Sequence, residues 1–124
     1  MQKKIAAFKE LLEIMDELRE KCPWDKEQTL ESLRKLTIEE TYELADAILQ
    51  NDLEMIKKEL GDLMLHIVFY SKIGSEKGAF DMGDVLEAIN KKLIYRHPHV
   101  FGDTEVNGSA RKVEENWEAL KLKE

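Results

Sequence analysis

The stretch EETYELADAILQNDLEMIKKELGD, residues 39–62, combines acidic and apolar residues at the three- and four-residue spacing of an α-helix. A polar break, QND, divides it into two segments. Strand-like alternation is absent here and along the rest of the chain. The stretch therefore predicts a helical hairpin within an all-α fold. Its clustered acids are Glu39, Glu40, Glu43, Glu59 and Asp62.

Helix start and stop signals divide the remaining chain. Pro23 and Pro98 each bias the preceding residue away from helical geometry, so we expect a helix to end before each of them. Thr37 and Glu40 have the T-x-x-E spacing of a capping box, which indicates that a helix begins there, after a short helical turn over residues 30–36. The expected helices cover residues 3–21, 37–50, 52–74 and 82–96, with a last short helix opened by Ser109.

The composition limits the class of protein. With 124 residues and 43% hydrophobic residues, the chain fits one domain, residues 1–124, with one modest core. Its formal net charge of -7 argues against nucleic acid or an anionic membrane as the main partner, and it suits cations. Cys22 is the only cysteine, and no apolar run approaches the roughly 20 residues that span a bilayer. We therefore expect a cytoplasmic protein.

The first three acids of the opening stretch have an ordinary explanation. At about 100° per residue, Glu39, Glu40 and Glu43 fall within an arc of roughly 100° on one helix. Glutamates at this spacing are typical of a solvated, charged helix face. These three residues alone do not predict a site.

The two later acids indicate a metal site. Glu59 and Asp62 lie in the same helical stripe as Leu63 and Tyr70, which we expect to face the core. An ionised carboxylate moved out of water needs a compensating partner. The hairpin brings these two acids toward the three glutamates, and a divalent cation resolves the repulsion. Oxygen ligands favour Mg2+ or Mn2+ over Zn2+, and five carboxylates suffice for more than one ion.

His66, four residues after Asp62 on the same face, has two interpretations. It is either a metal ligand or a packed, hydrogen-bonded histidine of the core, and we favour the second. Di-iron bundles, which also place carboxylates inside helices, use Glu-x-x-His pairs. The chain contains no such pair, so the pattern does not indicate a di-iron site.

Several motifs resemble those of the MazG-type nucleoside triphosphate pyrophosphohydrolases. The acids have the family's E-E-x-x-E and E-x-x-D spacing, and further signatures follow in the family's order. The likeness covers about residues 8–121 and is most similar to the amino-terminal repeat of members with two such domains. Tyr95 and Leu30 depart from the family pattern. The matching motifs are CPWD at Cys22–Asp25, IEETYE at Ile38–Glu43, ELGDL at Glu59–Leu63, RHPHVF at Arg96–Phe101 and WEALK at Trp117–Lys121.

This resemblance implies a fold and a reaction. The fold is a four-helix-bundle-like domain that a second copy completes, as a homodimer or within a tetramer. The reaction is Mg2+-dependent hydrolysis of a nucleoside triphosphate to the monophosphate and pyrophosphate, with water attacking the α-phosphorus. Glu40 or Glu43 is the implied catalytic residue that orients or deprotonates this water. The implied metal ligands are Glu39, Glu40, Glu43, Glu59 and Asp62.

Four residues form the predicted substrate-binding set. Asn90, Lys92 and Arg96 form the pattern N-x-K-x-x-x-R, in which Lys92 and Arg96 can present two positive charges to a triphosphate. The alternative is a solvated basic helix end favoured by the macrodipole. Trp24 can stack on a base, although a tryptophan is more often a core or interface plug.

Two other functions fit the same pattern. One is a related all-α pyrophosphohydrolase specific for a deoxynucleotide or for phosphoribosyl-ATP, which substrate profiling separates from a general enzyme. The other is a non-catalytic helical interaction module whose acids hold a structural metal ion. That module would bind divalent ions without turnover.

Overall fold

The chain is built from helices. The computed structural model describes residues 1–124 and contains seven helices and no strand, which confirms the all-α prediction. None of these helices combines the length and the apolar composition needed to cross a membrane. The helices are α1 (Gln2–Lys21), α2 (Pro23–Glu27), α3 (Leu30–Leu49), α4 (Leu53–Glu76), α5 (Met82–Arg96), α6 (Pro98–Phe101) and α7 (Ala110–Lys123).

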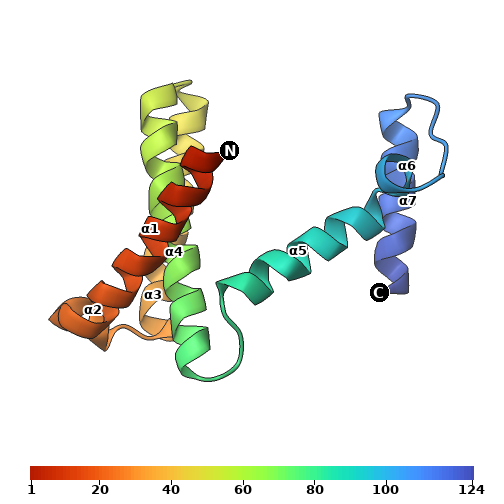
Figure 1. Cartoon of the computed structure of the whole chain (residues 1–124). Helices are drawn as coiled ribbons and strands as arrows, with labels where there is room; N and C mark the ends of the chain where they lie inside the picture. The colour runs from red at the N-terminus through yellow and green to blue at the C-terminus, as the bar shows by residue number, and fades with distance from the viewer. The chain divides into compact units, whose positions relative to one another are not determined.

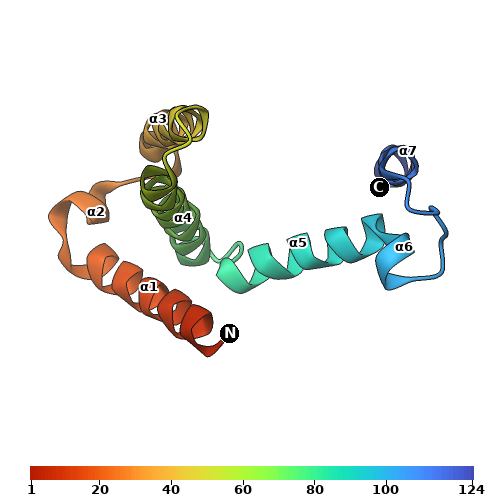
Figure 2. The same cartoon turned by 90° about the horizontal axis from the view of Figure 1, so that it is seen from above.

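The helices belong to two compact units, Met1–Met82 and Gly83–Glu124, each described by itself. In the first unit, α3 and α4 run side by side, and α1 packs against α4 (Figures 1 and 2). Residues from all three helices, together with Met82 at the start of α5, form its core. Full burial of such an apolar side chain stabilises the fold by about 1.5–3 kcal/mol. The expectation of one domain stays a prediction. The buried apolar residues are Met15, Leu33, Ala47, Val68, Phe69, Ile73 and Met82.

Pro23 acts as the sequence predicts and also begins a new helix. The first helix ends at Lys21, and Cys22 has extended backbone angles of φ -91° and ψ 119°. Pro23 then occupies the first turn of the short helix α2, which was not predicted. A proline is tolerated there because the first amides of a helix have no intrahelical partner. One proline therefore separates two helices.

The predicted helix start at Thr37 is wrong. The helix α3 begins seven residues earlier, at Leu30, and continues without a break to Leu49. Thr29 is its N-cap: the Thr29 hydroxyl accepts from the Ser32 amide at 3.0 Å, and the Thr29 amide donates to the Ser32 hydroxyl at 2.8 Å. This reciprocal pair satisfies the free amides at the helix start. Thr37 therefore lies inside the helix, where its hydroxyl has other partners.

The hairpin between α3 and α4 turns within three residues. Asn51 has a positive φ of 55°, and Asp52 caps α4 by accepting a hydrogen bond from the Met55 amide at 3.1 Å. Asparagine tolerates this left-handed conformation better than most residues do. The turn places the acids of α3 and α4 on neighbouring helices, as the sequence predicted.

The second unit contains most of α5 together with α6 and α7. The α5 helix ends at Arg96, before Pro98, as predicted. Ser109 caps α7 as predicted, with its hydroxyl accepting from the Lys112 amide at 3.2 Å. Completion of the fold by a second copy stays a prediction.

Candidate metal site on helices α3 and α4

Three of the five predicted acids converge between α3 and α4. Carboxylate oxygens of Glu40, Glu43 and Glu59 lie within 4.8 Å of one another. Glu59 is buried, with 8% of its surface exposed, whereas Glu43 is exposed and Glu40 is half-buried. The group therefore begins beneath the surface of the hairpin and opens to solvent. We call these three residues the acid cluster.

The electrostatics of the acid cluster are unfavourable without a cation. The pKa of Glu40 is raised to about 7, first by burial, then by a hydrogen bond to Glu59 that only a protonated carboxyl can make, and then by the charges of Asp62 and Glu43. When both groups are ionised, Oε2 of Glu40 and Oε2 of Glu59 are buried without a hydrogen-bond partner. Each unsatisfied charged oxygen costs free energy of folding.

A divalent cation fits this arrangement. The donors are carboxylate oxygens, which Mg2+ and Mn2+ prefer, and two of these oxygens have no other partner. Buried charges in proteins are paired or coordinate metals. The acid cluster can therefore hold a hard divalent ion and leave further coordination positions to water or phosphate.

Asp62 lies near the acid cluster but differs from the sequence prediction. We expected it to face the core with Glu59, and the structure instead leaves Asp62 exposed. Its negative charge helps to raise the pKa of Glu40 and partly offsets the lowering of the pKa of His66 by burial, so it acts on both groups. Asp62 is therefore an outer acid of the site, accessible to a ligand from solvent.

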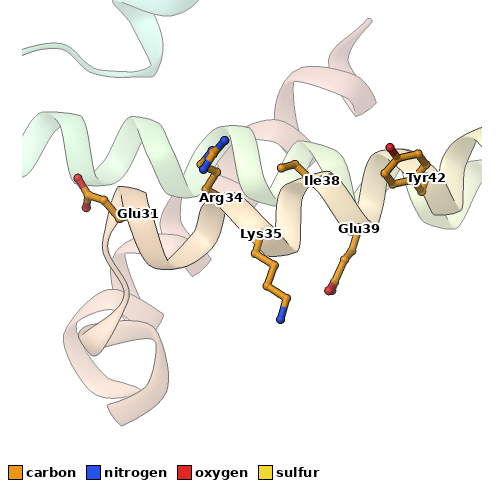
Figure 3. A pocket seen from close by; sticks show the side chains of 6 residues that line it. All are labelled: Glu31, Arg34, Lys35, Ile38, Glu39 and Tyr42. Atoms are coloured by element: carbon orange, nitrogen blue, oxygen red, sulfur yellow. The ribbon is translucent and has the colours of Figure 1, made fainter.

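Glu39 lies outside the acid cluster. It lines a separate groove of about 410 Å³ on the outer face of α3. Figure 3 shows that Glu39 and Lys35 project to the same side of this helix. The spacing of the three glutamates did not show that Glu39 and Glu40 serve different places. In the structure, Glu39 lies at the groove and Glu40 lies in the acid cluster. The groove is lined by Glu31, Arg34, Lys35, Ile38, Glu39 and Tyr42.

A polar network lies beside the acid cluster, one helical turn away along α3 and two turns away along α4. The Thr37 hydroxyl on α3 is 2.6 Å from Nδ1 of His66 on α4 and is also hydrogen-bonded to the Tyr70 hydroxyl. Burial lowers the pKa of His66, and the charge of Asp62 opposes this effect. His66 is thus a hydrogen-bonded histidine between helices, as predicted, but it is half-buried and does not lie in the core. The roles of Thr37 and Tyr70 were missed because the T-x-x-E spacing suggested a helix cap.

The predicted substrate-binding residues lie in different parts of the chain. Trp24 is on α2, 53% exposed and outside the acid cluster, so it is not a core plug. Asn90 and Lys92 are exposed on α5, in the second unit. Their contact with substrate stays a prediction.

Arg96 has protein partners within the second unit. Its guanidinium donates to both carboxylate oxygens of Glu124, at 2.9 and 2.6 Å, and lies 5.2 Å from the centre of the Trp117 ring. Arg96 is buried, with 8% of its surface exposed. A phosphate would have to displace the Glu124 carboxylate to make the same bidentate contact. The arrangement differs from the solvated basic helix end that was the alternative.

Comparison with known proteins identifies the same family that the sequence motifs resemble. The family model of the MazG nucleotide pyrophosphohydrolase domain matches residues 28–101, which include the acid cluster, Glu39 and Asp62. The Thermotoga maritima nucleoside triphosphate pyrophosphohydrolase/pyrophosphatase MazG is 49% identical over 119 residues, covering 94% of this chain and 45% of that protein. The Escherichia coli K12 nucleoside triphosphate pyrophosphohydrolase is 46% identical over 117 residues, covering 92% of this chain and 44% of that protein.

A solved structure shares the fold. The crystal structure of a MazG-related protein from Thermotoga maritima matches with a TM-score of 0.77 at 26% identity, covering 92% of this chain and 98% of that one. The chain spans less than half the length of the two named pyrophosphohydrolases. Both the extent of the family match and the shared fold show that the chain belongs to the MazG nucleotide pyrophosphohydrolase domain family.

Proposed function

We propose that the protein hydrolyses nucleoside triphosphates to nucleoside monophosphate and pyrophosphate, in a reaction that depends on Mg2+. The observation that carries this proposal is the acid cluster, in which two buried carboxylate oxygens lack partners beside an exposed glutamate. Family membership supports the reaction type, since relatives with this domain are named for that activity.

Glu40, Glu43 and Glu59 would hold Mg2+, or Mn2+ as its substitute, with the exposed Asp62 as a further ligand. Glu39 lies outside the acid cluster, and its role as a ligand stays a prediction. When bound, the cation supplies positive charge that offsets the repulsion among the acids and attracts the phosphate oxygens of the substrate. Through that cation, the acids of α3 and α4 would set the position of the triphosphate relative to the hairpin. More than one ion is compatible with the number of carboxylates.

The chain also supplies the groups for the proton transfer. In the proposed reaction, water attacks the α-phosphorus, the bond from that phosphorus to the bridging oxygen breaks, and pyrophosphate leaves. Glu40 or Glu43 accepts the proton of the water, since a general base must lie within hydrogen-bond reach of it. Asn90, Lys92 and Arg96 are proposed to bind phosphates, and Trp24 is proposed to stack on the base.

Product analysis tests this function. The protein is incubated with a panel of ribo- and deoxynucleoside triphosphates, with and without Mg2+, and a Glu40→Gln, Glu43→Gln double variant serves as the control. We expect monophosphate and pyrophosphate from the wild type, with Mg2+ only. Release of orthophosphate, or equal turnover by the double variant, would overturn the proposal. Mg2+ binding without turnover would identify the non-catalytic module instead.

We infer that the protein acts as a homodimer, or as a tetramer, in the cytoplasm. Leu60, Met64 and Ile67 form an apolar stripe on α4 at helical spacing, with exposed fractions of 53%, 38% and 41%. Coverage of such a stripe by a second copy removes apolar surface from water. A monomer in light scattering at micromolar concentration contradicts this inference.

A single cysteine, Cys22, suits a reducing compartment.

A further inference from the structure

The network of Thr37, His66 and Tyr70 lies on the same seam between α3 and α4 as the acid cluster. On α3, Thr37 precedes Glu40 by three residues, and on α4, His66 follows Glu59 by seven. Residues at these separations lie on one face of a helix. Two groups of side chains therefore follow one another along the interface between α3 and α4. The acids of the acid cluster repel one another, whereas the hydroxyl and imidazole groups of the network form hydrogen bonds.

The Thr37 hydroxyl has three neighbours and only one proton. It lies 3.1 Å from the Leu33 carbonyl, 2.6 Å from Nδ1 of His66 and within hydrogen-bond distance of the Tyr70 hydroxyl. A carbonyl accepts only, so Thr37 must donate to Leu33 if all three contacts are hydrogen bonds. Thr37 then accepts from both Tyr70 and His66. This arrangement requires the His66 proton on Nδ1 and leaves Nε2 unprotonated in the neutral ring.

The acid cluster needs an attractive contact beside it. Without a cation, ionised Glu40 is disfavoured by burial and by the negative charge of Asp62 on the facing helix, and this repulsion favours separation of α3 from α4. The Thr37 contacts join the same two helices at the next turn. A site that is held in its binding geometry before the ligand arrives binds the ligand more tightly, because binding then costs less conformational entropy of the side chains.

We propose that Thr37, His66 and Tyr70 form a positioning clamp that holds α3 against α4 and so preorganises the acid cluster for Mg2+, with His66 protonated at Nδ1. The clamp touches neither substrate nor reacting atoms, so its members are positioning residues. This inference rests on the proposed function in one respect, the binding of Mg2+ by the acid cluster.

The chain offers a matched control for the clamp. Thr41 is also on α3, but its exposed hydroxyl bonds only to the Ile38 carbonyl of its own helix, at 2.6 Å. Thr37→Val and Thr41→Val therefore make the same chemical change on the same helix, and only the first removes a contact to α4. Thr37→Ser restores the hydroxyl, and Tyr70→Phe removes one donor of the clamp without touching α3.

Calorimetric titration with Mg2+ alone, at neutral pH, tests the clamp. We expect Thr37→Val to weaken binding by about tenfold, equivalent to about 1.4 kcal/mol, and Thr41→Val and Thr37→Ser to stay within about twofold of the wild type. Tyr70→Phe should weaken binding in the same direction. Equal affinities for Thr37→Val and Thr41→Val would overturn the clamp and leave the proposed function intact. Absence of Mg2+ binding by the wild type would overturn both.

A second measurement needs no variant. A long-range proton–nitrogen NMR spectrum of the wild-type protein reports which ring nitrogen of His66 carries the proton. We expect Nδ1, because Thr37 can accept from it while donating to Leu33. A proton on Nε2 alone would contradict the clamp, even if Thr37→Val failed to fold.

Discussion

Arg19 of α1 and Glu76 of α4 form a bidentate ion pair, in which the guanidinium donates three hydrogen bonds of 2.8 to 3.1 Å to the carboxylate. The same guanidinium donates to the backbone carbonyls of Asp25, Lys26 and Gln28 at 2.7, 3.0 and 2.8 Å. Arg19 therefore ties the segment around α2 to the two longer helices. The planar five-donor geometry of arginine suits this combination, and lysine could not reproduce it.

Removal of this ion pair should destabilise the protein in a pH-dependent manner. The hydrogen bond from Arg19 is the main cause that lowers the pKa of Glu76 below its ordinary value of 4.5. The ion pair therefore stabilises the folded protein above pH 4.5, the ordinary pKa of the carboxyl group. This stabilisation is lost as the pH falls through the lower pKa that Glu76 has in the folded protein. We expect Glu76→Gln to reduce the free energy of unfolding by about 1 kcal/mol at neutral pH, and by less in acid. Urea denaturation at several pH values measures this.

Glu54→Gln is the control for that experiment. Glu54 also lies on α4, but its side chain is 80% exposed and pairs only with Lys57 one turn away. Its removal should change stability little at any pH, since exposed pairs of this kind contribute little. If Glu76→Gln behaved like Glu54→Gln, the ion pair with Arg19 would not be contributing.

Glu59→Gln should have opposite effects on metal binding and on stability. Glu59 is the buried member of the acid cluster, and its Oε2 has no partner. The neutral amide removes one ligand charge, so Mg2+ affinity should fall by about tenfold or more. The same change relieves repulsion with Glu40, so the metal-free variant should unfold at a higher urea concentration. Wild-type affinity for Mg2+ in this variant would exclude Glu59 from the site.

The stability of the metal-free protein should fall as the pH rises from 4.5 to about 7. The pKa of Glu40 rises from 4.5 in its ordinary state to about 7 in the folded protein. The folded state therefore favours the protonated form of Glu40. The stabilisation that this preference gives is present below pH 4.5 and is lost between pH 4.5 and about 7. Glu40→Gln should flatten that dependence. Urea midpoints with a chelator present measure it, and identical slopes for both proteins would contradict the assignment.

Two glycines of α4 should respond differently to alanine. A Cβ at Gly61 meets nothing within 4 Å, whereas a Cβ at Gly74 lies 2.5 Å from the Phe80 ring. Alanine is the better helix former, so Gly61→Ala should stabilise the protein by about 0.5–1 kcal/mol. Gly74→Ala should gain less or lose stability, because the Phe80 ring must move. Equal thermal shifts for the two variants would contradict this packing.

The fold class and the helix ends could be predicted because their causes are local. Pro23 and Ser109 act through backbone geometry and capping, and both behave as the sequence indicates. Thr37 was misinterpreted because two capping patterns begin eight residues apart, and Thr29 with Ser32 forms the real cap. The hydrogen-bond partners of Thr37 lie on α4, about thirty residues later in the chain, so a local pattern does not reveal them.

The acid cluster was predictable only in part. Periodicity places Glu39 and Glu40 on one broad arc of the helix, about 100° apart, and cannot decide which one faces α4. The exposure of Asp62 depends on how α4 is rotated against its neighbours, which sequence spacing does not define. The Arg96 contact with Glu124 joins residues that are 28 apart in the chain, so no local pattern indicates it.

The continuity of α3 has a mechanical consequence. Glu39 faces the outer groove and Glu40 the acid cluster, and both are held by one unbroken helix from Leu30 to Leu49. Because adjacent residues on a helix keep a fixed angular offset, the two faces cannot turn independently. Any rotation of α3 about its long axis would therefore move the Glu39 and Glu40 carboxylates together, through the same angle.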